Sequence, residues 1–430
     1  MMKIAYLTLG CKLNYAETST YERLLREQGF DATPWNSGEA DAYLVNTCSV
    51  TEHSDKKCRN IIRKLHRRSP QAPIFVTGCS AQLRRPVLEA LDGVVRVFSA
   101  GEKQAVAGTV AAWLRPSLPC ENALNETAMF CAWSSAGRTR SFLKVQDGCD
   151  YKCHYCTVPY ARGASRNAPI ADIVGQAREI AATGIREIVL TGVNTGDFGK
   201  STGENFADLL KALEQVEGIR RYRISSIEPN LLTEAVIDWI AGSSRKFLPH
   251  FHIPLQSGCD DILRAMGRRY LTEDFRRKIA YIREKMGREV FLGIDVIVGF
   301  PGESEADFLQ TYRFLEELRP AFIHIFPYSR RPGTPAATMQ GQVQDSIKDG
   351  RVKRLEELCR RLHGEFVRRQ AGREEEVLIE SSDKQGYMYG YTKNYVKIRI
   401  PYDAALAGAV LPLTLKPEQL CMEEEEGGAL

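Results

Sequence analysis

Three cysteines, Cys149, Cys153 and Cys156, lie close together with the spacing C-x-x-x-C-x-x-C. Three thiolates suit a four-iron cluster that leaves one iron without a protein ligand, whereas a fourth cysteine would close the cluster for electron transfer. An open iron can bind a small chelating molecule instead. The alternatives are a zinc site completed by His154 and a disulfide in an oxidising compartment. His154 is badly placed between two of the cysteines and nothing in the sequence indicates export, so the spacing favours the open cluster.

Three further cysteines, Cys11, Cys48 and Cys79, are spread through residues 1–115, which we expect to be one domain. Strands alternate with helices in this region, and that order predicts a parallel sheet with helices on its faces. The expected strands are Lys3–Leu9, Ala42–Val45, Ile74–Thr77 and Val94–Phe98, and the expected helices are Ala16–Gln28, Asp55–Arg68, Arg85–Leu91 and Glu102–Leu114. Each cysteine follows a strand directly, at the edge where open α/β sheets build their sites. The three thiols should therefore converge on a second cluster, although any one of them could be an ordinary buried side chain.

Residues 139–370 read as six strand–helix units, too few for a complete eight-fold barrel. The expected strands are Phe142–Gln146, Glu187–Leu190, Tyr222–Ser225, His250–Pro254, Val290–Val298 and Phe322–Phe326. The expected helices are Ala168–Thr183, Asn205–Val216, Thr233–Ser243, Asp260–Met266, Thr272–Met286 and Ser304–Leu318. The first strand leads into the cysteine loop, which places this loop at the carboxyl-terminal face where barrel enzymes keep their chemistry.

The cysteine loop, from Gly148 to Gly163, resembles the motif of the radical S-adenosylmethionine (SAM) superfamily, whose domain is an open (β/α)6 barrel. The resemblance implies that the open iron chelates the amino acid end of SAM and that reductive cleavage yields a 5′-deoxyadenosyl radical. The strand exits Thr191–Asn194 and Gly293–Glu303 resemble the segments that hold the methionyl amine and the adenine of SAM. The cofactor-binding residues expected on this basis are Tyr155, Gly192, Asn194, Ser226 and Asp295. A glycine-rich strand exit is also a common turn, and Asp295 could equally be a structural carboxylate.

Residues 371–430 are expected to form a small β-barrel followed by an acidic tail, Glu423–Glu426. Its expected strands are Glu376–Glu380, Gly386–Tyr391, Val396–Ile400 and Val410–Leu415, and residues 116–138 are expected to be a linker. Tyrosines at 387, 389, 391 and 395 could stack on bases or could simply pack in the sheet. Residues 370–430 hold six Lys or Arg against eleven Asp or Glu, which is unusual for an RNA-binding barrel. Two basic helices, Lys56–Arg68 and Arg351–Arg369, could contact phosphates instead, with a solvated face as the alternative.

The two cysteine groups and the small C-terminal barrel together resemble the methylthiotransferase family over nearly the whole chain. The segments that carry the resemblance are Gly10–Asn14, Asn46–Val50, Gly78–Gln82 and Gly148–Gly163, and the last barrel resembles the tRNA-binding TRAM domain. Three further segments, Tyr160–Gly163, Ile224–Pro229 and Pro327–Pro335, resemble the subgroup that acts on threonylcarbamoyladenosine in tRNA. The fold expected is thus an open parallel α/β domain, a partial radical SAM barrel and a TRAM-like barrel.

The resemblance implies two [4Fe-4S] clusters and SAM as cofactors. The cluster at Cys149, Cys153 and Cys156 would cleave SAM, and the cluster at Cys11, Cys48 and Cys79 would carry a sulfur that a second SAM methylates. The product would be 2-methylthio-threonylcarbamoyladenosine next to the anticodon, in a loop whose bases can be splayed into a pocket. Arg330 and Arg331 are candidates for the threonylcarbamoyl carboxylate, although both could be solvated surface residues. A tRNA anticodon loop, a reducing protein such as flavodoxin or ferredoxin, and a sulfur donor are the expected partners.

Other functions remain open at this point. A relative with the same chemistry could act on isopentenyl-adenosine in tRNA or on a ribosomal protein, and a non-enzymatic iron–sulfur or RNA-binding protein, or a zinc module, would be of a different class. The 430 residues carry a formal net charge of only +4, which is too small to identify a partner. Twelve cysteines without a signal peptide or a transmembrane-length apolar run indicate a cytoplasmic protein with reduced thiols and no membrane partner. We assign no ligand role to Cys58, Cys120, Cys131, Cys259, Cys359 or Cys421.

Overall fold

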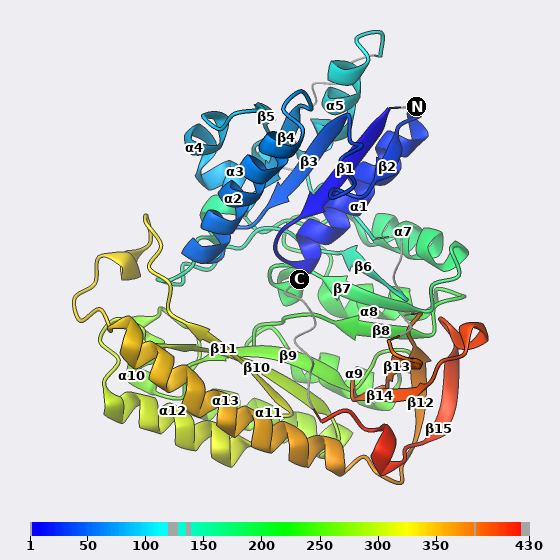
Figure 1. Cartoon of the computed structure of the whole chain (residues 1–430). Helices are drawn as coiled ribbons and strands as arrows, with labels where there is room; N and C mark the ends of the chain where they lie inside the picture. Colours follow the sequence, from blue (N-terminus) through cyan, green and yellow to red (C-terminus); the bar gives the residue numbers. More distant parts are fainter. Residues whose placement is uncertain (1, 119–127, 135–138, 382–383, 423–430) are drawn as a thin grey trace.

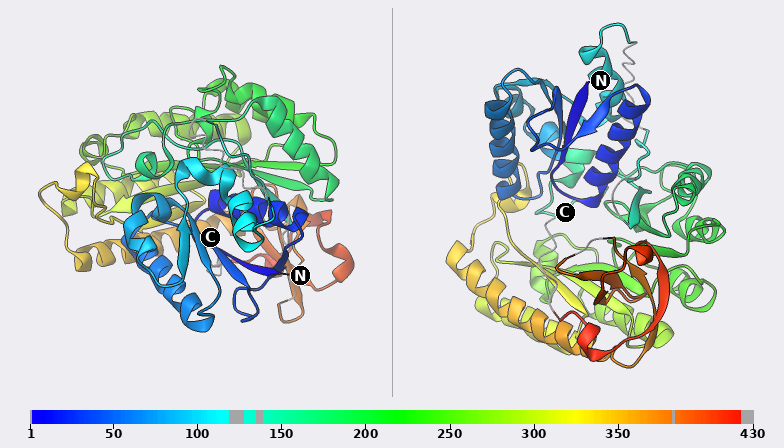
Figure 2. Two further views of the ribbon diagram at one scale, coloured as in Figure 1. Left: turned by 90° about the horizontal axis from the view of Figure 1, so that it is seen from above. Right: turned by 45° about the vertical axis from the view of Figure 1, so that its right-hand side comes forward.

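The computed structural model describes residues 2–118, 128–134, 139–381 and 384–422 (Figure 1). An N-terminal α/β unit, blue to cyan in Figure 1, lies above a larger central unit, green to yellow, and a small C-terminal sheet, red, packs at the side of the central unit. The two further views keep the N-terminal unit over the central one, so the contact between them is not an effect of projection (Figure 2). The mixed α/β class and the arrangement in three units agree with the fold expected from the sequence.

The N-terminal unit is a parallel five-stranded sheet in the order β2-β1-β3-β4-β5. Its elements are β1 (Lys3–Thr8), α1 (Lys12–Glu27), β2 (Asp31–Thr33), β3 (Ala42–Thr47), α2 (Glu52–Arg68), β4 (Ile74–Gly78), α3 (Cys79–Leu83), α4 (Arg85–Glu89), β5 (Val94–Val97), η1 (Ala100–Ala105) and α5 (Val106–Leu114). Every residue of the central strand β3 is buried, as expected for a strand covered on both faces. Strand β2 was not expected because it has only three residues, two of them exposed, and so carries no apolar pattern.

The central unit contains the six expected strand–helix pairs. Its elements are β6 (Arg140–Lys144), α6 (Val158–Arg162), α7 (Ile170–Ala182), β7 (Glu187–Thr191), η2 (Thr195–Asp197), α8 (Phe206–Glu214), β8 (Arg221–Ile224), α9 (Glu234–Gly242), β9 (His250–Gln256), α10 (Asp260–Ala265), α11 (Thr272–Met286), β10 (Phe291–Val298), α12 (Glu305–Leu318), β11 (Phe322–Pro327), η3 (Pro335–Ala337) and α13 (Asp345–Arg368). The strands form two parallel sheets, β6-β7-β8 and β11-β10-β9. Single parallel bridges from Tyr222 to Phe247 and from Ser226 to His252 join the two sheets into one open barrel.

The C-terminal unit is an antiparallel sheet in the order β14-β13-β12-β15. Its elements are β12 (Glu374–Ile379), β13 (Tyr387–Tyr391), β14 (Lys397–Pro401), η4 (Ala404–Leu406), β15 (Val410–Thr414) and η5 (Pro417–Gln419). It packs on the amino-terminal ends of the barrel strands, where Arg221 donates to the backbone carbonyls of Tyr391 and Thr392 at 3.0 and 2.8 Å. Tyr395 also faces the barrel and packs edge-on against His250. Stacking on RNA bases is therefore a prediction that we withdraw for Tyr391 and Tyr395, because both face the barrel.

Part of the segment expected to be a linker packs against the central unit. Trp133 pairs with Leu143 of β6 in an antiparallel bridge, and its indole Nε1 donates to Glu179 at 3.1 Å. Cys120 and the acidic tail Glu423–Glu426 lie outside the described residues. Within the described part of the chain, no helix is both long enough and apolar enough to cross a membrane.

Candidate active site

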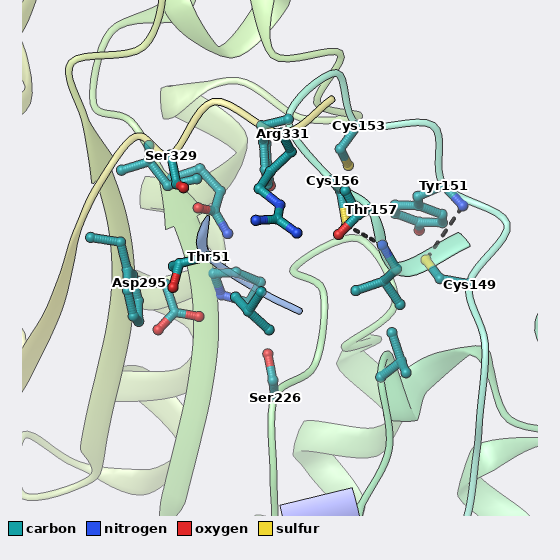
Figure 3. Close-up of a pocket in the computed structure, with 18 of the residues that line it drawn as sticks. Thr51, Cys149, Tyr151, Cys153, Cys156, Thr157, Ser226, Asp295, Ser329 and Arg331 are labelled. Atoms are coloured by element: carbon teal, nitrogen blue, oxygen red, sulfur yellow. Dashed lines mark hydrogen bonds between the residues drawn. The ribbon is translucent and has the colours of Figure 1, made fainter. Parts of the chain in front are cut away.

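A cavity of about 460 Å³ lies between the N-terminal unit and the mouth of the barrel. Cys11, from the end of β1, shares this cavity with all three cysteines of the loop after β6. Four of the six cysteines expected to bind clusters thus meet in one place, although Cys11 is far from the other three in the sequence. Figure 3 shows the three loop cysteines along one side of the cavity, with Asp295 and Ser226 below them and the Arg331 side chain directed into the space.

The cysteine loop is held in a tight conformation. Gly148 has φ +72°, and a Cβ at this position would lie 1.9 Å from the carbonyl oxygen of Ala164, so only glycine fits. Backbone amides of Tyr151 and Val158 donate to the Sγ atoms of Cys149 and Cys156, each at 3.4 Å (Figure 3). These amides already point at the sulfur atoms, as they do around a bound thiolate cluster.

Burial favours the protonated thiols of Cys149 and Cys156 in the absence of metal. It raises the pKa of Cys149 to about 11 and that of Cys156 to about 12. A metal must therefore displace protons as it binds, which makes metal affinity dependent on pH.

Gln146, a residue that sequence reasoning missed, fixes the loop to the neighbouring strand exit. Its Nε2 donates to the carbonyl oxygens of Asp147 and Gly148, at 3.0 and 2.7 Å, and its Oε1 accepts from the backbone N–H of Asn194 at 2.9 Å. One amide side chain therefore satisfies backbone groups of both segments that line the cavity. No pattern in the sequence indicated this role, because it depends on which strands become neighbours.

The N-terminal cysteines converge as the strand-end argument predicted. Cys11 precedes the first residue of α1, Cys48 follows β3 and Cys79 begins α3. Gly10 lies so close to Cys48 that a Cβ on Gly10 would meet the Cys48 Sγ at 3.0 Å. Burial raises the pKa of Cys48 to about 12, and the neighbouring Cys79 and Cys11 raise it further. Of the three, Cys11 alone lines the cavity, so Cys48 and Cys79 lie behind it.

Four of the five expected cofactor residues line the cavity: Tyr155, Asn194, Ser226 and Asp295. The side-chain amide of Asn194 is buried, and neither its nitrogen nor its oxygen has a hydrogen-bond partner among the described residues. A buried amide without partners is costly unless a ligand satisfies it, so this group fits a polar cofactor. Gly192 does not line the cavity. It packs against Gln146, where a Cβ would meet Oε1 at 3.0 Å, so its role is to allow that contact.

Arg268 is a second residue that the sequence did not indicate. Its side chain is almost fully buried and donates from Nη1 to Cys153 Sγ and to the Tyr155 hydroxyl, each at 3.1 Å. Its Nη2 pairs with Glu228, which also lines the cavity. Arg268 therefore ties the cysteine loop, through Cys153 and Tyr155, to Glu228 with hydrogen bonds from a charged group.

Beside Cys79 lies a buried network of charged side chains that joins the two units. Glu17 of α1 and Asp147 are its acids, and its bases are Lys103, Lys144, Arg162 and Arg166. Burial alone would raise the pKa of Glu17, but Lys103, Lys144 and Arg162 outweigh it and hold this pKa well below its usual range. Four cations face two acids, so the network carries two uncompensated positive charges.

Arg162 brings this positive charge to the N-terminal cysteines. Arg162 follows Cys156 within the same loop, and it donates to Asp147 at 2.9 Å and to Asn14 of α1. Burial raises the pKa of Cys79, and Arg162 opposes this rise more strongly than Lys103 does. Excess positive charge beside three thiols suits a thiolate-bound cluster, which is an anion.

The zinc alternative fits less well. His154 does not line the cavity, and its Nδ1 lies 2.7 Å from the carbonyl oxygen of Ala265, which orients the ring away from the cysteines. The three cysteines of the loop therefore have no histidine beside them as a fourth ligand, and three thiols of one loop suit an open iron–sulfur cluster.

Two family models match the chain. The radical SAM superfamily matches residues 143–315, and a family described as uncharacterized protein family UPF0004 matches residues 3–99. The threonylcarbamoyladenosine tRNA methylthiotransferase MtaB of Bacillus subtilis is 37% identical over 93% of this chain and 90% of its own length. The chain belongs to the radical SAM tRNA methylthiotransferase family. MtaB of Thermotoga maritima is 35% identical, with 92% of this chain and 91% of the relative covered.

Other members of the family are also similar. The tRNA-2-methylthio-N(6)-dimethylallyladenosine synthase of Alkaliphilus oremlandii is 32% identical over 95% of this chain and 89% of its own length. Among solved structures, the radical SAM methyltransferase TsrM of Kitasatospora setae aligns with a TM-score of 0.58 at 14% identity, covering 89% of this chain and 79% of TsrM. That likeness establishes the fold only. As a family member, this methylthiotransferase is an enzyme that transfers sulfur-containing groups and uses SAM and [4Fe-4S] clusters.

Proposed function

We propose that this methylthiotransferase adds a methylthio group to carbon 2 of threonylcarbamoyladenosine next to the anticodon of tRNA. The observation that carries the proposal is the shared cavity, where Cys11 faces Cys149, Cys153 and Cys156. One cysteine group starts the reaction and the other delivers sulfur, so the chemistry needs both groups within reach of one substrate atom. The relatives named MtaB support threonylcarbamoyladenosine as the substrate.

In this proposal Cys149, Cys153 and Cys156 hold the cluster that binds SAM, and Cys11, Cys48 and Cys79 hold the second cluster. With SAM, the clusters supply the radical chemistry that removes an unactivated hydrogen from adenine, which no general base can usefully do. The protein contributes position and charge. Asn194, Ser226 and Asp295 offer polar groups to SAM, and the loop around Gly148 fixes the three sulfur atoms.

The C-terminal sheet offers a surface for tRNA despite its acidic composition. Tyr387 and Tyr389 share a face of β13 with Tyr391, because alternate residues of a strand share a face, but Tyr387 lies at the opposite end of the strand from Tyr391 and is 43% exposed. Lys384 and Lys397 lie 5.7 and 4.5 Å from the ring of Tyr389, and Arg399 lies 5.4 Å from the ring of Tyr387. Aromatic rings among cations suit single-stranded RNA, which stacks its bases and needs its phosphates balanced. We propose that a reducing protein such as flavodoxin or ferredoxin and a sulfur donor complete the system.

The test is mass spectrometry of tRNA nucleosides from a strain that lacks this protein. We expect loss of 2-methylthio-threonylcarbamoyladenosine, restored by the wild type but not by Cys48→Ser. Cys58→Ser is the matched control, since Cys58 is buried nearby and its thiol donates to the Cys48 carbonyl oxygen at 3.5 Å, the one acceptor it has among the residues that the structure describes. Full activity in Cys48→Ser would remove the second cluster from the proposal. Loss of a methylthio group from isopentenyl-adenosine instead would reassign the substrate.

Iron and sulfide content after anaerobic reconstitution tests the two clusters directly. About eight irons in the wild type, falling to about four in a Cys149/Cys153/Cys156→Ala variant, would agree with two independent clusters. About four irons falling to none would leave only the SAM cluster, and Cys11, Cys48 and Cys79 would then have no part in sulfur transfer.

A further inference from the structure

One face of helix α2 is strongly basic and exposed. The opposite face is buried in the core of the N-terminal unit through Cys58, Ile62 and Leu65. From residue 56 to residue 68 the helix contains no acid. The exposed cations of the outer face are Lys56, Lys57, Arg63, Lys64, Arg67 and Arg68. Charge of this density is balanced either by ions of the solvent or by an anionic partner.

Almost none of this charge is balanced by the protein. Among the residues that the structure describes, the six cations make a single ion pair, from Lys56 to Glu52 at 3.3 Å, and its two side chains are 62% and 63% exposed. Lys64 lies 5.7 Å from the ring of Trp35, which carries no charge. Five exposed cations of α2 therefore have no acidic partner within the described part of the chain.

The other basic helix of the sequence, α13, is different in this respect. Four of its arginines pair with glutamates of other segments at distances from 2.6 to 3.5 Å: Arg351, Arg354, Arg361 and Arg369. Its exposed surface also carries two acids, Glu356 and Glu357. The charge of α13 is thus largely balanced within the protein, and α2 is the better candidate for an anionic partner.

The amino-terminal end of α2 lies at the rim of the active-site cavity. Its N-cap residue, Thr51, lines the cavity. The backbone N–H of Glu52 donates at 3.2 Å to the hydroxyl of Ser329, which also lines the cavity. Arg331 fixes the same end of the helix, because it pairs with Asp55 at 2.6 Å. From this rim the helix runs along the outside of the N-terminal unit (Figure 1), and its basic stretch is about 18 Å long.

The exposed face of α2 suits a nucleic acid better than a protein. Every exposed residue of the helix is polar, whereas interfaces between proteins have an apolar centre. Lysine and arginine bind phosphates of any sequence, and they need no apolar contact to do so. When an anticodon loop enters the cavity, the stem that closes the loop must pass the rim of the cavity. A row of cations that begins at this rim therefore lies where the phosphates of a stem would come.

We propose that the basic face of α2 binds phosphates of the anticodon stem while the loop occupies the cavity. The inference rests on the proposed function, which requires an anticodon loop in the cavity, and it identifies the surface that holds the rest of this RNA arm. Contacts to phosphates fix the position of an RNA but carry no sequence information. The helix therefore contributes affinity for any tRNA, and the choice of nucleoside is made inside the cavity.

The test is the salt dependence of RNA binding. An anticodon stem-loop with threonylcarbamoyladenosine is bound to the reconstituted enzyme at several concentrations of potassium chloride, and affinity is measured by fluorescence anisotropy without turnover. One variant combines Lys57→Gln, Arg63→Gln and Arg67→Gln, since glutamine removes the charge at nearly equal helix propensity. Loss of three phosphate contacts should reduce the slope of log affinity against log salt by about 2 and weaken binding at least about 10-fold at low salt.

The matched control removes three exposed cations from α13, with Lys353→Gln, Arg360→Gln and Arg368→Gln combined in one chain. Both variants change the net charge equally, so only direct contact with the RNA should distinguish them. Iron content and melting temperature confirm that each variant is loaded and folded. An unmodified stem-loop should lose affinity by the same factor as the modified one, because phosphate contacts do not depend on the base.

Three results would overturn the proposal. The first is an α2 variant with the affinity and slope of the wild type, which would mean that the face is only solvated. The second is an equal loss in the α13 variant. The third is an α2 variant that binds RNA normally but is reduced more slowly by flavodoxin, which would assign the face to the reducing protein. The proposed function fails separately: if the enzyme binds RNA through α2 but modifies another nucleoside, the phosphate surface stands and the substrate is reassigned.

Discussion

The network beside Cys79 predicts that removing one of its acids costs more stability than removing one of its bases. Glu17 accepts from Lys103, Lys144 and Arg162 at 2.8, 2.7 and 3.2 Å through a single oxygen. Glu17→Gln keeps the shape but leaves four buried cations with one acid. Breaking a buried pair in this way costs about 3–5 kcal/mol, and we expect about 3 kcal/mol because glutamine remains an acceptor.

Arg162→Gln changes the balance in the opposite direction. Three cations still face two acids, so neither carboxylate loses its partners, and the cost is mainly that of hydrogen bonds to charged groups. We expect about 1.5–2 kcal/mol. With an unfolding entropy of about 2.1 cal/mol/K per residue in a chain of 430 residues, Glu17→Gln should lower the melting temperature by about 3 °C, and Arg162→Gln by about half as much.

The assay is thermal unfolding of the metal-free chain at pH 7.5, followed by circular dichroism. Glu22→Gln is the matched control, since Glu22 also lies on α1 but pairs with Arg26 at the surface, where a pair contributes less than about 1 kcal/mol. The depressed pKa of Glu17 means that its contribution is complete above pH 4.5 and is lost as the pH falls. The reasoning is refuted if Arg162→Gln is the more damaging change, or if Glu17→Gln matches Glu22→Gln.

Three other predictions concern single residues. Arg268→Gln removes a hydrogen-bond donor to Cys153, so the reduction potential of the cluster should fall by on the order of 60 mV. A redox titration followed by electron paramagnetic resonance measures this potential, and an unchanged value would contradict the contact. Gln146→Leu leaves backbone groups of both cavity segments without partners, so the affinity for SAM, measured by calorimetry, should weaken about 10-fold or more. Equal affinity of the variant and the wild type for SAM would argue against the role of Gln146. Burial and then His252 lower the pKa of His324 to about 4, so its neutral form contributes stability above pH 6.5 that is lost as the pH falls towards 4. His324→Phe should remove up to about 3 kcal/mol of the pH dependence of stability between pH 6.5 and pH 4. If the melting temperatures of the variant and the wild type change in parallel across this pH range, the prediction is wrong.

Cys11, Cys48 and Cys79 could be placed from the sequence because the carboxyl ends of neighbouring parallel strands must meet at one edge of a sheet. The six strand–helix units of the barrel could likewise be predicted from the strand and helix patterns in the sequence. Arg268 and Gln146 could not be found in this way, since each acts on a segment far away in the chain. Their roles depend on the closure of the barrel, which brings residue 268 to residue 153 and residue 146 to residue 194. For Gly192, contact with SAM stays a prediction from its motif, and the sequence did not indicate that this glycine lies against Gln146.

The first two turns of α1 explain why the N-terminal unit sits over the barrel. Cys11 is at the N-cap position and lines the cavity, Tyr15 packs against Phe142 of the barrel, and Asn14 and Glu17 bind the network around Arg162. Asn14 also donates to the carbonyl oxygen of Thr47, next to Cys48, at 2.9 Å. A single helix thus fixes one cysteine group relative to the other, because its two faces are held by different units. The helical rotation between residues 12 and 17 fixes which residues of α1 lie on each of these two faces. A movement of the charged network would therefore also move Cys11, and a movement of Cys11 would move the network. The buried charged network on one face of this helix is therefore part of how the two cysteine groups are held relative to one another.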